Sequence, residues 1–410
     1  MKATLLAIAL LVPASAWPQN VAITNVKIIV GTGQVVDSGT IVVRDGKIAT
    51  VTGASVQLPR GLQVIDAKGM SAMPGFIDGH KHLADGPTGK AWMQSLLEAG
   101  YTTVLIGGGT AEANLALARK IESGEYNGPR VIPSGAIALR QTPLEARVAV
   151  QALAAMGIKH TGEIGLTPEP APPQAEIEVL KAIVDEAKKV GIQVNVHAVS
   201  SPAMIAAIDA GVTRLVHLPN KDWTSYEQAD SVAKAGAIVA GLIAFGAPNV
   251  DTLSQGPAPV QWPRDNTPRF RDGKAWPEAI VGANRDAKGR ATGTEGGFTI
   301  INARRIWDAD SNHATISYST DQNADDLVVL EHELKSFSIV FSMADIHRII
   351  GPNAARFVGM ADQIGTLETG KLADIILLDG DPTKNIYEML KTKVVLKEGK
   401  IVVDKRRTGG

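Results

Sequence analysis

The stretch PGFIDGHKHLAD, residues 74–85, places two histidines shortly after a short apolar run. The run at residues 75–77 is typical of a buried β-strand, and residues i and i+2 of a strand share one face. His80 and His82 can therefore direct their imidazoles at one point, which supplies half of a transition-metal site. The alternative is a pair of surface histidines in a turn, so the rest of the chain must supply the missing ligands.

Composition narrows the function classes. The 410 residues are 45% hydrophobic and 20% charged, which is ordinary for a globular protein with a sizeable core. The formal net charge is −1 and no basic block occurs, so neither nucleic acid nor an anionic membrane surface is expected as a partner. Because the chain has no cysteine, disulfides and thiolate ligands are excluded, and a metal must be held by histidine, carboxylate or modified lysine.

The first residues have the pattern of an export signal. Lys2 precedes an apolar run at residues 3–12, and Ala14-Ser15-Ala16 has the small-x-small form of a cleavage site. We predict a signal peptide over residues 1–16, cleaved after about Ala16, and a periplasmic or secreted protein. The run is too short to span a bilayer, so no stable membrane anchoring is expected after cleavage.

The middle of the chain alternates apolar strands with helical stretches, which is the pattern of βα units. Helices are predicted at residues 92–99, 110–124, 148–156, 177–191 and 201–211, the last with Ser201 as its cap. Eight strands are predicted, at residues 75–77, 101–106, 130–134, 158–166, 192–197, 213–217, 237–245 and 314–321. The count closes a (β/α)8 barrel, an α/β fold. Short β-rich segments with turns fill residues 21–72 and recur at residues 365–378 and 394–403, and Asp45-Gly46 is typical of a hairpin turn.

Three further side chains stand at the carboxyl ends of predicted strands, where barrel proteins place their sites. His197 ends strand five, His217 ends strand six and Asp321 ends strand eight. Strand four offers two candidates, Glu163 and Lys159, which cannot be ligands at the same depth because four strand residues span roughly 13 Å. Counted along its strand, Glu163 lies near the depth of the histidines and Lys159 lies low in the barrel.

Residues 73–82 resemble the first-strand signature of the amidohydrolase superfamily, metal-dependent hydrolases on a (β/α)8 barrel. The resemblance extends from Asp45-Gly46-Lys47 to the segment at residues 370–374 and covers most of the chain. It implies a small β-sandwich built from residues 20–73 and 362–405, beside a catalytic barrel at residues 74–361. It also implies two divalent metal ions, zinc first, with iron, manganese or cobalt as alternatives. The implied metal ligands are His80, His82, Glu163, His197, His217 and Asp321.

The resemblance leaves the bridging ligand open. Many members carry a carboxylated lysine on strand four, which would be Lys159 here. Residues 161–166 resemble instead the enamidase branch, in which a glutamate is the bridge, and this favours Glu163. The chain is also similar to imidazolonepropionases and Xaa-Pro dipeptidases.

These features imply an exported amidohydrolase that hydrolyses an amide C–N bond by attack of a metal-bound hydroxide. Asp321 is the implied catalytic residue, which takes the proton from water and delivers it to the leaving group. The substrate is expected to be a cyclic amide or an N-acyl or dipeptide-type small molecule. The alternatives are an ester, lactone or phosphotriester hydrolase on the same centre, and a non-catalytic exported binding protein.

Two regions are candidates for substrate contact. Asn220 and Lys221 follow His217 directly, where a solvated loop is the alternative interpretation. The segment at residues 246–300 is long and rich in Gly, Pro and Asn, which is typical of a lid or of a surface insertion. Its candidate carboxylate-binding residues are Arg264, Arg269 and Arg271. His160 and Tyr318 are expected to pack in the core, and a homo-oligomer is expected.

Overall fold

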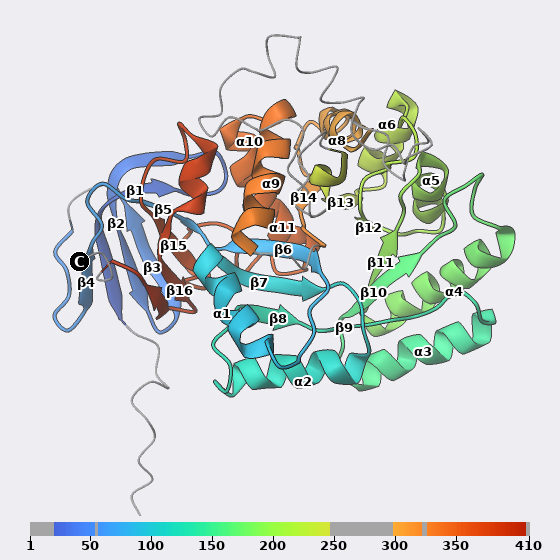
Figure 1. Cartoon of the computed structure of the whole chain (residues 1–410), viewed down its shortest axis with the longest axis horizontal. Coiled ribbons are helices and arrows are strands. Elements are labelled where there is room, and N and C mark those ends of the chain that lie inside the picture. The colour runs from blue at the N-terminus through green and yellow to red at the C-terminus, as the bar shows by residue number, and fades with distance from the viewer. Residues whose placement is uncertain (1–19, 54–55, 247–297, 322–325, 407–410) are drawn as a thin grey trace, which may run out of the picture.

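The computed structural model describes residues 20–53, 56–246, 298–321 and 326–406. They form a β-sheet unit built from both ends of the chain and a larger unit of strands and helices beside it (Figure 1). The predicted signal peptide, Arg264, Arg269, Arg271 and almost all of the 246–300 segment lie outside the described residues. Within the described ranges, no helix is both long enough and apolar enough to cross a membrane.

The β-sheet unit joins the two ends of the chain, as the resemblance implied. Its sheet has the order β17-β16-β15-β5-β1-β2-β3, with β4 paired to β1. The central contact is antiparallel pairing of β5 with β15, in which Ile375 faces Pro74. The strands are β1 (Val21–Ile29), β2 (Val35–Arg44), β3 (Lys47–Thr52), β4 (Gln63–Asp66), β5 (Ser71–Pro74), β15 (Ile375–Leu378), β16 (Thr392–Lys397) and β17 (Lys400–Asp404).

This sheet folds over itself because β1 changes partners along its length. Asn25 has a left-handed backbone (φ 57°), and the register of β1 against β2 shifts on either side of Val26. The first half of β1 pairs with β4 and the second half with β5, so two layers enclose one apolar core. β2 and β3 are joined by the predicted hairpin turn, in which Asp45 and Gly46 both have positive φ, as a type I′ turn requires.

The barrel strands are parallel and follow the predicted order. They are β6 (Phe76–Lys81), β7 (Tyr101–Ile106), β8 (Arg130–Ile132), β9 (Ser134–Gly135), β10 (His160–Gly165), β11 (Gln193–His197), β12 (Arg214–Val216), β13 (Ile238–Gly241) and β14 (Ile316–Tyr318). One sheet runs β6-β7-β8 and the other runs from β9 to β14. The predicted third strand is split between β8 and β9 by Pro133, which has no N–H to donate. Beyond β14 the Asp321 N–H donates to the His80 carbonyl at 2.9 Å, which links strand position eight to strand position one in a (β/α)8 barrel.

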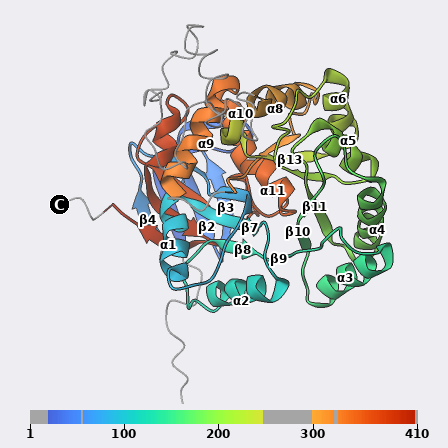
Figure 2. The same ribbon diagram turned by 45° about the vertical axis from the view of Figure 1, so that its right-hand side comes forward.

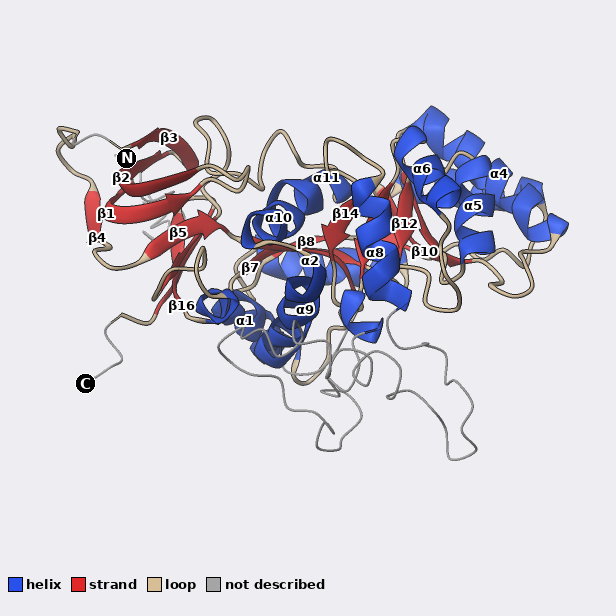
Figure 3. Ribbon diagram, turned by 90° about the horizontal axis from the view of Figure 1, so that it is seen from above, coloured by secondary structure: helices blue, strands red, loops and turns tan. Residues whose placement is uncertain are grey.

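Helices cover the outer face of these strands, and the terminal sheet lies at one side of the barrel (Figures 2 and 3). They are α1 (Gly89–Ala99), α2 (Ala111–Glu122), α3 (Pro143–Ala155), α4 (Gln174–Val190), α5 (Ser201–Asp209), α6 (Tyr226–Lys234), α8 (Phe298–Asp308), α9 (Asp326–Val340), α10 (Met343–Arg348) and α11 (Ala354–Phe357). Shorter turns are η2 (Ile243–Gly246), η4 (Ile349–Asn353) and η5 (Ile386–Leu390).

Three helices begin earlier than predicted, α1 at Gly89, α3 at Pro143 and α4 at Gln174, and the cap of α5 also differs. α3 begins at Pro143, not near Val148, because Thr142 and Glu145 form a capping box and the first-turn residue Leu144 is exposed. α5 is capped by Ser200, whose side chain accepts the Ala203 N–H, so the cap lies one residue before Ser201. The predicted seventh strand is also shorter, because the chain turns into η2 after β13.

The amino-terminal end of the barrel is covered by α11 and the residues after it. Arg214, the first residue of β12, donates from Nε to the Phe357 carbonyl at 2.8 Å. His160, the first residue of β10, has its Nε2 3.2 Å from the Val358 carbonyl. His160 and Tyr318 are both buried in the core, as predicted. The carboxyl ends of the strands, where barrel proteins place their sites, lie opposite this covered end.

Candidate metal centre

The structure brings six predicted side chains together at the carboxyl ends of five barrel strand positions. His80 lies on β6, and His82 is the first residue after the end of that strand. Glu163 lies on β10. The remaining three are His197, the last residue of β11; His217, which follows β12; and Asp321, three residues beyond β14.

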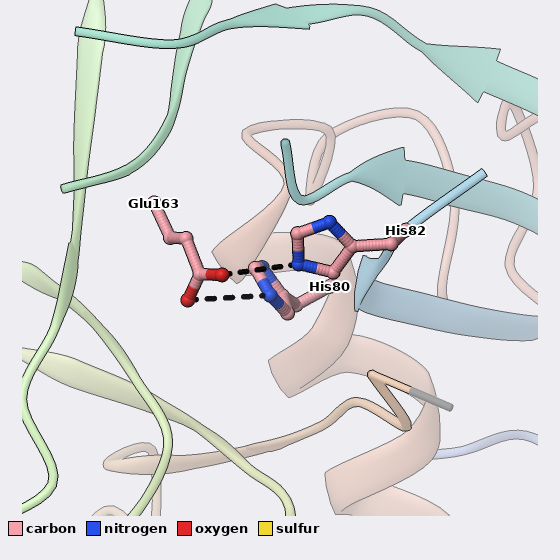
Figure 4. A group of neighbouring side chains, drawn as sticks. All are labelled: His80, His82 and Glu163. Carbon is pink, nitrogen blue, oxygen red and sulfur yellow. Dashed lines mark hydrogen bonds and ion pairs between the residues drawn. The ribbon is translucent and has the colours of Figure 1, made fainter. Parts of the chain in front are cut away.

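Glu163 is the centre of this group. Its Oε1 lies 3.0 Å from Nε2 of His82, and its Oε2 lies 2.8 Å from Nδ1 of His197. The same Oε2 is 3.4 Å from Nε2 of His217 and 3.6 Å from Nε2 of His80. Figure 4 shows the carboxylate directed at the rings of His80 and His82. Glu163 therefore lies between two pairs of histidines, which is the position that a ligand shared by two cations requires.

Asp321 approaches the same rings from the strand-eight side. Its Oδ1 is 3.2 Å from Nε2 of His82 and 3.4 Å from Nε2 of His80, and its Oδ2 is 3.7 Å from Nε2 of His217. The six side chains form three overlapping triads whose ligand atoms lie within 4.8 Å of one another. The triads are His80–His82–Glu163, His80–His217–Asp321 and Glu163–His197–His217.

Two of the six residues have left-handed backbones. The φ angles are 68° at His217 and 51° at Asp321, a region that costs a non-glycine residue about 1–3 kcal/mol. Each is held by a backbone hydrogen bond to a neighbouring strand position, from His217 N–H to the Ala240 carbonyl and from Asp321 N–H to the His80 carbonyl. Such conformations turn the side chains from the strand direction into the barrel mouth and are typical of functional sites.

Two glycines that the strand pattern does not single out make room for the imidazoles. A Cβ at Gly107 would lie 2.3 Å from Cε1 of His80, and a Cβ at Gly108 would lie 2.7 Å from Cε1 of His82. The Gly107 carbonyl also accepts the Glu163 N–H at 2.7 Å. The signal available in the sequence is the run Gly107-Gly108-Gly109 directly after strand two, since glycine allows another group to approach the backbone closely.

The electrostatics of the group favour bound cations. Burial would raise the pKa of Glu163, but its contacts with His197, His217 and His82 outweigh burial and hold that pKa far below its usual range. Burial would also raise the pKa of Asp321, but its contact with His80 outweighs burial, so that pKa is lowered overall. Burial lowers the pKa of His217 and so favours its neutral form, whereas the bond to Glu163 raises the pKa of His82.

These residues fit a divalent metal centre. The buried Nε2 of His80 faces both carboxylates yet makes no hydrogen bond among the described residues. Anionic carboxylates and neutral imidazoles are the nitrogen and oxygen donors that zinc and related ions prefer. When bound, such ions supply Lewis acidity toward a carbonyl and lower the pKa of a water molecule from about 15.7 to about 7.

The remaining predicted residues lie apart from this cluster. Lys159 is exposed and precedes β10, at the end of the strand opposite Glu163, so the structure does not bring it to the histidines. Asn220 and Lys221 lie on the loop that follows His217, where both backbone N–H groups donate to the Val199 carbonyl. Their role in substrate binding stays a prediction.

Comparison with known proteins agrees with this geometry. The profile of the amidohydrolase family matches residues 71–237 and 290–402. An enamidase of Eubacterium barkeri is 29% identical over 184 residues, which are 40% of this chain and 45% of that protein. A dihydroorotase of Elusimicrobium minutum is 38% identical over 91 residues, 20% of this chain and 21% of that protein. These matches span less than half of the length of either relative.

A solved structure extends the similarity to the whole fold. A Xaa-Pro dipeptidase with methionine bound in its active site superposes with a TM-score of 0.73 at 19% sequence identity. The superposition covers 93% of this chain and 99% of that one, so it includes both the sheet unit and the barrel.

Proposed function

Because the chain belongs to the amidohydrolase family, we propose that it is a metal-dependent hydrolase that cleaves an amide C–N bond. The observation that carries this proposal is the position of Glu163, within reach of four histidines and beside Asp321 at the barrel mouth. We further propose that the centre holds two divalent ions, zinc first, with Glu163 between them.

In this proposal the protein's own residues have distinct tasks. The four imidazoles and Glu163 would hold the ions, with His80 and His82 on one side of Glu163 and His197 and His217 on the other. The pKa of Asp321 is lowered from an ordinary value that already lies far below neutrality, so the side chain is anionic at pH 7 and can accept a proton from water. A carboxylic acid so formed can then deliver that proton to the leaving nitrogen, which a permanently charged group could not do.

The proposed substrate is a small molecule with an amide bond. A cyclic amide or an N-acyl or dipeptide-type compound is proposed, with the partial matches to an enamidase and a dihydroorotase in its favour. Export through the segment at residues 1–16 and assembly into a homo-oligomer are also proposals.

The test is reconstitution of the metal-free protein. Protein stripped with a chelator should be inactive on a panel of cyclic amides, N-acyl amino acids, dipeptides and lactones, and addition of zinc, manganese or cobalt should restore hydrolysis of at least one of the three amide classes. Glu163→Gln is the matched negative control for metal addition, since it keeps the shape of this proposed ligand's side chain and removes its charge. Hydrolysis of lactones alone would replace the amide assignment by esterase activity. Equal activity with and without metal would contradict the proposal.

A further inference from the structure

Directly behind the metal-binding side chains lies a set of buried polar groups that none of the proposed chemistry uses. Asp78 and Thr320 are 0% exposed, and Lys81 and Asp326 are 1% exposed. They come from β6, from the residues that follow β14 and from the start of α9. We refer to these four residues as the buried tie.

Asp78 bonds to residues of both strand positions that carry His80 and Asp321. Its Oδ1 accepts the backbone N–H groups of His80 and Thr320, each at 3.1 Å. Its Oδ2 accepts the Thr320 hydroxyl at 2.5 Å. One carboxylate therefore holds the backbone of His80 and the residue that precedes Asp321.

Lys81 extends the tie to α9. Its Nζ donates to the Thr320 hydroxyl oxygen at 3.3 Å and lies 3.3 Å from Oδ1 of Asp326, the first residue of α9. Asp326 also accepts the indole N–H of Trp92 on α1 at 3.3 Å. The Thr320 hydroxyl thus donates to Asp78 and accepts from Lys81, so a single oxygen joins the two halves of the tie.

Stability alone does not explain this arrangement. Removing two carboxylates and an ammonium from water is costly, and well-packed apolar residues commonly serve a core equally well. The tie does, however, hold Thr320, the neighbour of Asp321 in the chain. Asp321 has a left-handed backbone, which the surrounding structure must stabilise. Polar groups that orient metal ligands from behind are a general means of setting metal affinity.

We infer that the buried tie positions His80 and Asp321 relative to each other and thereby sets the affinity of the metal centre. Its members are positioning residues, since none of them is among the triads that face the proposed ions. The inference rests on the proposed metal site, but it concerns affinity and makes no claim about the substrate.

Thr320→Val tests the tie, because it keeps the branched shape and removes the hydroxyl on which both halves depend. Thr320→Ser keeps the hydroxyl and serves as the rescue variant. Thr102→Val is the matched control, since Thr102 is equally buried on the neighbouring β7 but its hydroxyl has no hydrogen-bond partner among the described residues. Asp326→Asn gives a second test in which Lys81 still faces the Asp78 carboxylate, so no buried charge is left alone.

The measurement is the zinc affinity of each metal-free protein by competition with a chromophoric chelator, with thermal unfolding as the check on folding. Thr320→Val should weaken zinc binding by about 10–100-fold and Asp326→Asn by about tenfold, while Thr320→Ser and Thr102→Val stay within about threefold of wild type. If Thr320→Val does not fold, Asp326→Asn decides.

Folded tie variants that bind zinc as tightly as wild type would overturn the inference, and so would an equal loss in Thr102→Val. These outcomes leave the proposed function intact. A wild-type protein that binds no zinc would overturn the proposed function, and this inference with it.

Discussion

Gly107→Ala adds one methyl group behind the ring of His80. The new Cβ would lie 2.3, 2.6 and 2.7 Å from Cε1, Nε2 and Nδ1 of that ring, whereas ordinary contact begins at 3.4 Å. The ring must therefore retreat by about 1 Å, and because His80 is only 2% exposed it has little space to do so. Zinc–nitrogen bonds of about 2.0–2.1 Å tolerate deviations of about 0.2 Å, so the displaced imidazole cannot keep its bond.

We expect Gly107→Ala to lower zinc affinity by at least about 100-fold and hydrolysis by a similar factor, since a displacement of about 1 Å commonly costs that much. Gly165→Ala is the matched control, because Gly165 ends β10, its φ is not in the left-handed region, and a Cβ there would meet nothing within 4 Å. Chelator competition gives the affinities, and thermal unfolding of the metal-free proteins checks that both fold. Full zinc affinity in a folded Gly107→Ala variant would refute the argument that the glycine makes room for a metal ligand.

Three further predictions address other residues. Asp321→Asn should lower turnover by about 10²–10⁴-fold through loss of the base, and turnover within about threefold of wild type at equal metal content would rule out its role as proton shuttle. Lys159→Ala should leave zinc content and hydrolysis unchanged, because the side chain is exposed at the far end of β10; loss of metal would reinstate the lysine bridge. Burial and the charge of Arg214 lower the pKa of His160 in the folded protein to about 3. Between this value and the unfolded pKa of about 6.5, only the unfolded chain binds the proton, so the free energy of unfolding decreases as the pH is lowered. Between pH 7 and pH 5 this loss amounts to about 2 kcal/mol. In urea unfolding of the metal-free proteins, the free energy of unfolding of His160→Gln should therefore decrease by about 2 kcal/mol less than that of wild type over this range. An equal decrease in the two proteins would contradict this prediction.

The strand pattern predicted most of the barrel because its period is local. His80 and His82 share a face through the two-residue repeat of a strand, and depth along strand four favours Glu163 over Lys159 from the sequence alone. The structure places Lys159 at the exposed end and Glu163 among the histidines, in agreement with that count. The metal and catalytic roles of the six residues stay predictions.

What the sequence could not show depends on long-range approach. The bond between Asp78 and Thr320 joins residues 242 positions apart, and nothing in either local pattern indicates the partner. The need for Gly107 follows only from the distance between the end of β7 and a ring on β6. The start of α3 at Pro143 differs from prediction for another reason, because the first-turn residue Leu144 is exposed and adds nothing to the apolar face, while the capping box sets the boundary.

The central claim is that Glu163 lies between two metal ions at the mouth of the barrel. A crystal structure of the zinc-loaded protein, with anomalous data collected at the zinc edge, tests it most directly. We predict two zinc ions about 3.5–4 Å apart with the Glu163 carboxylate between them, His80 and His82 on one ion and His197 and His217 on the other. A single ion away from Glu163, or no anomalous signal at this site in zinc-saturated crystals, would contradict the account.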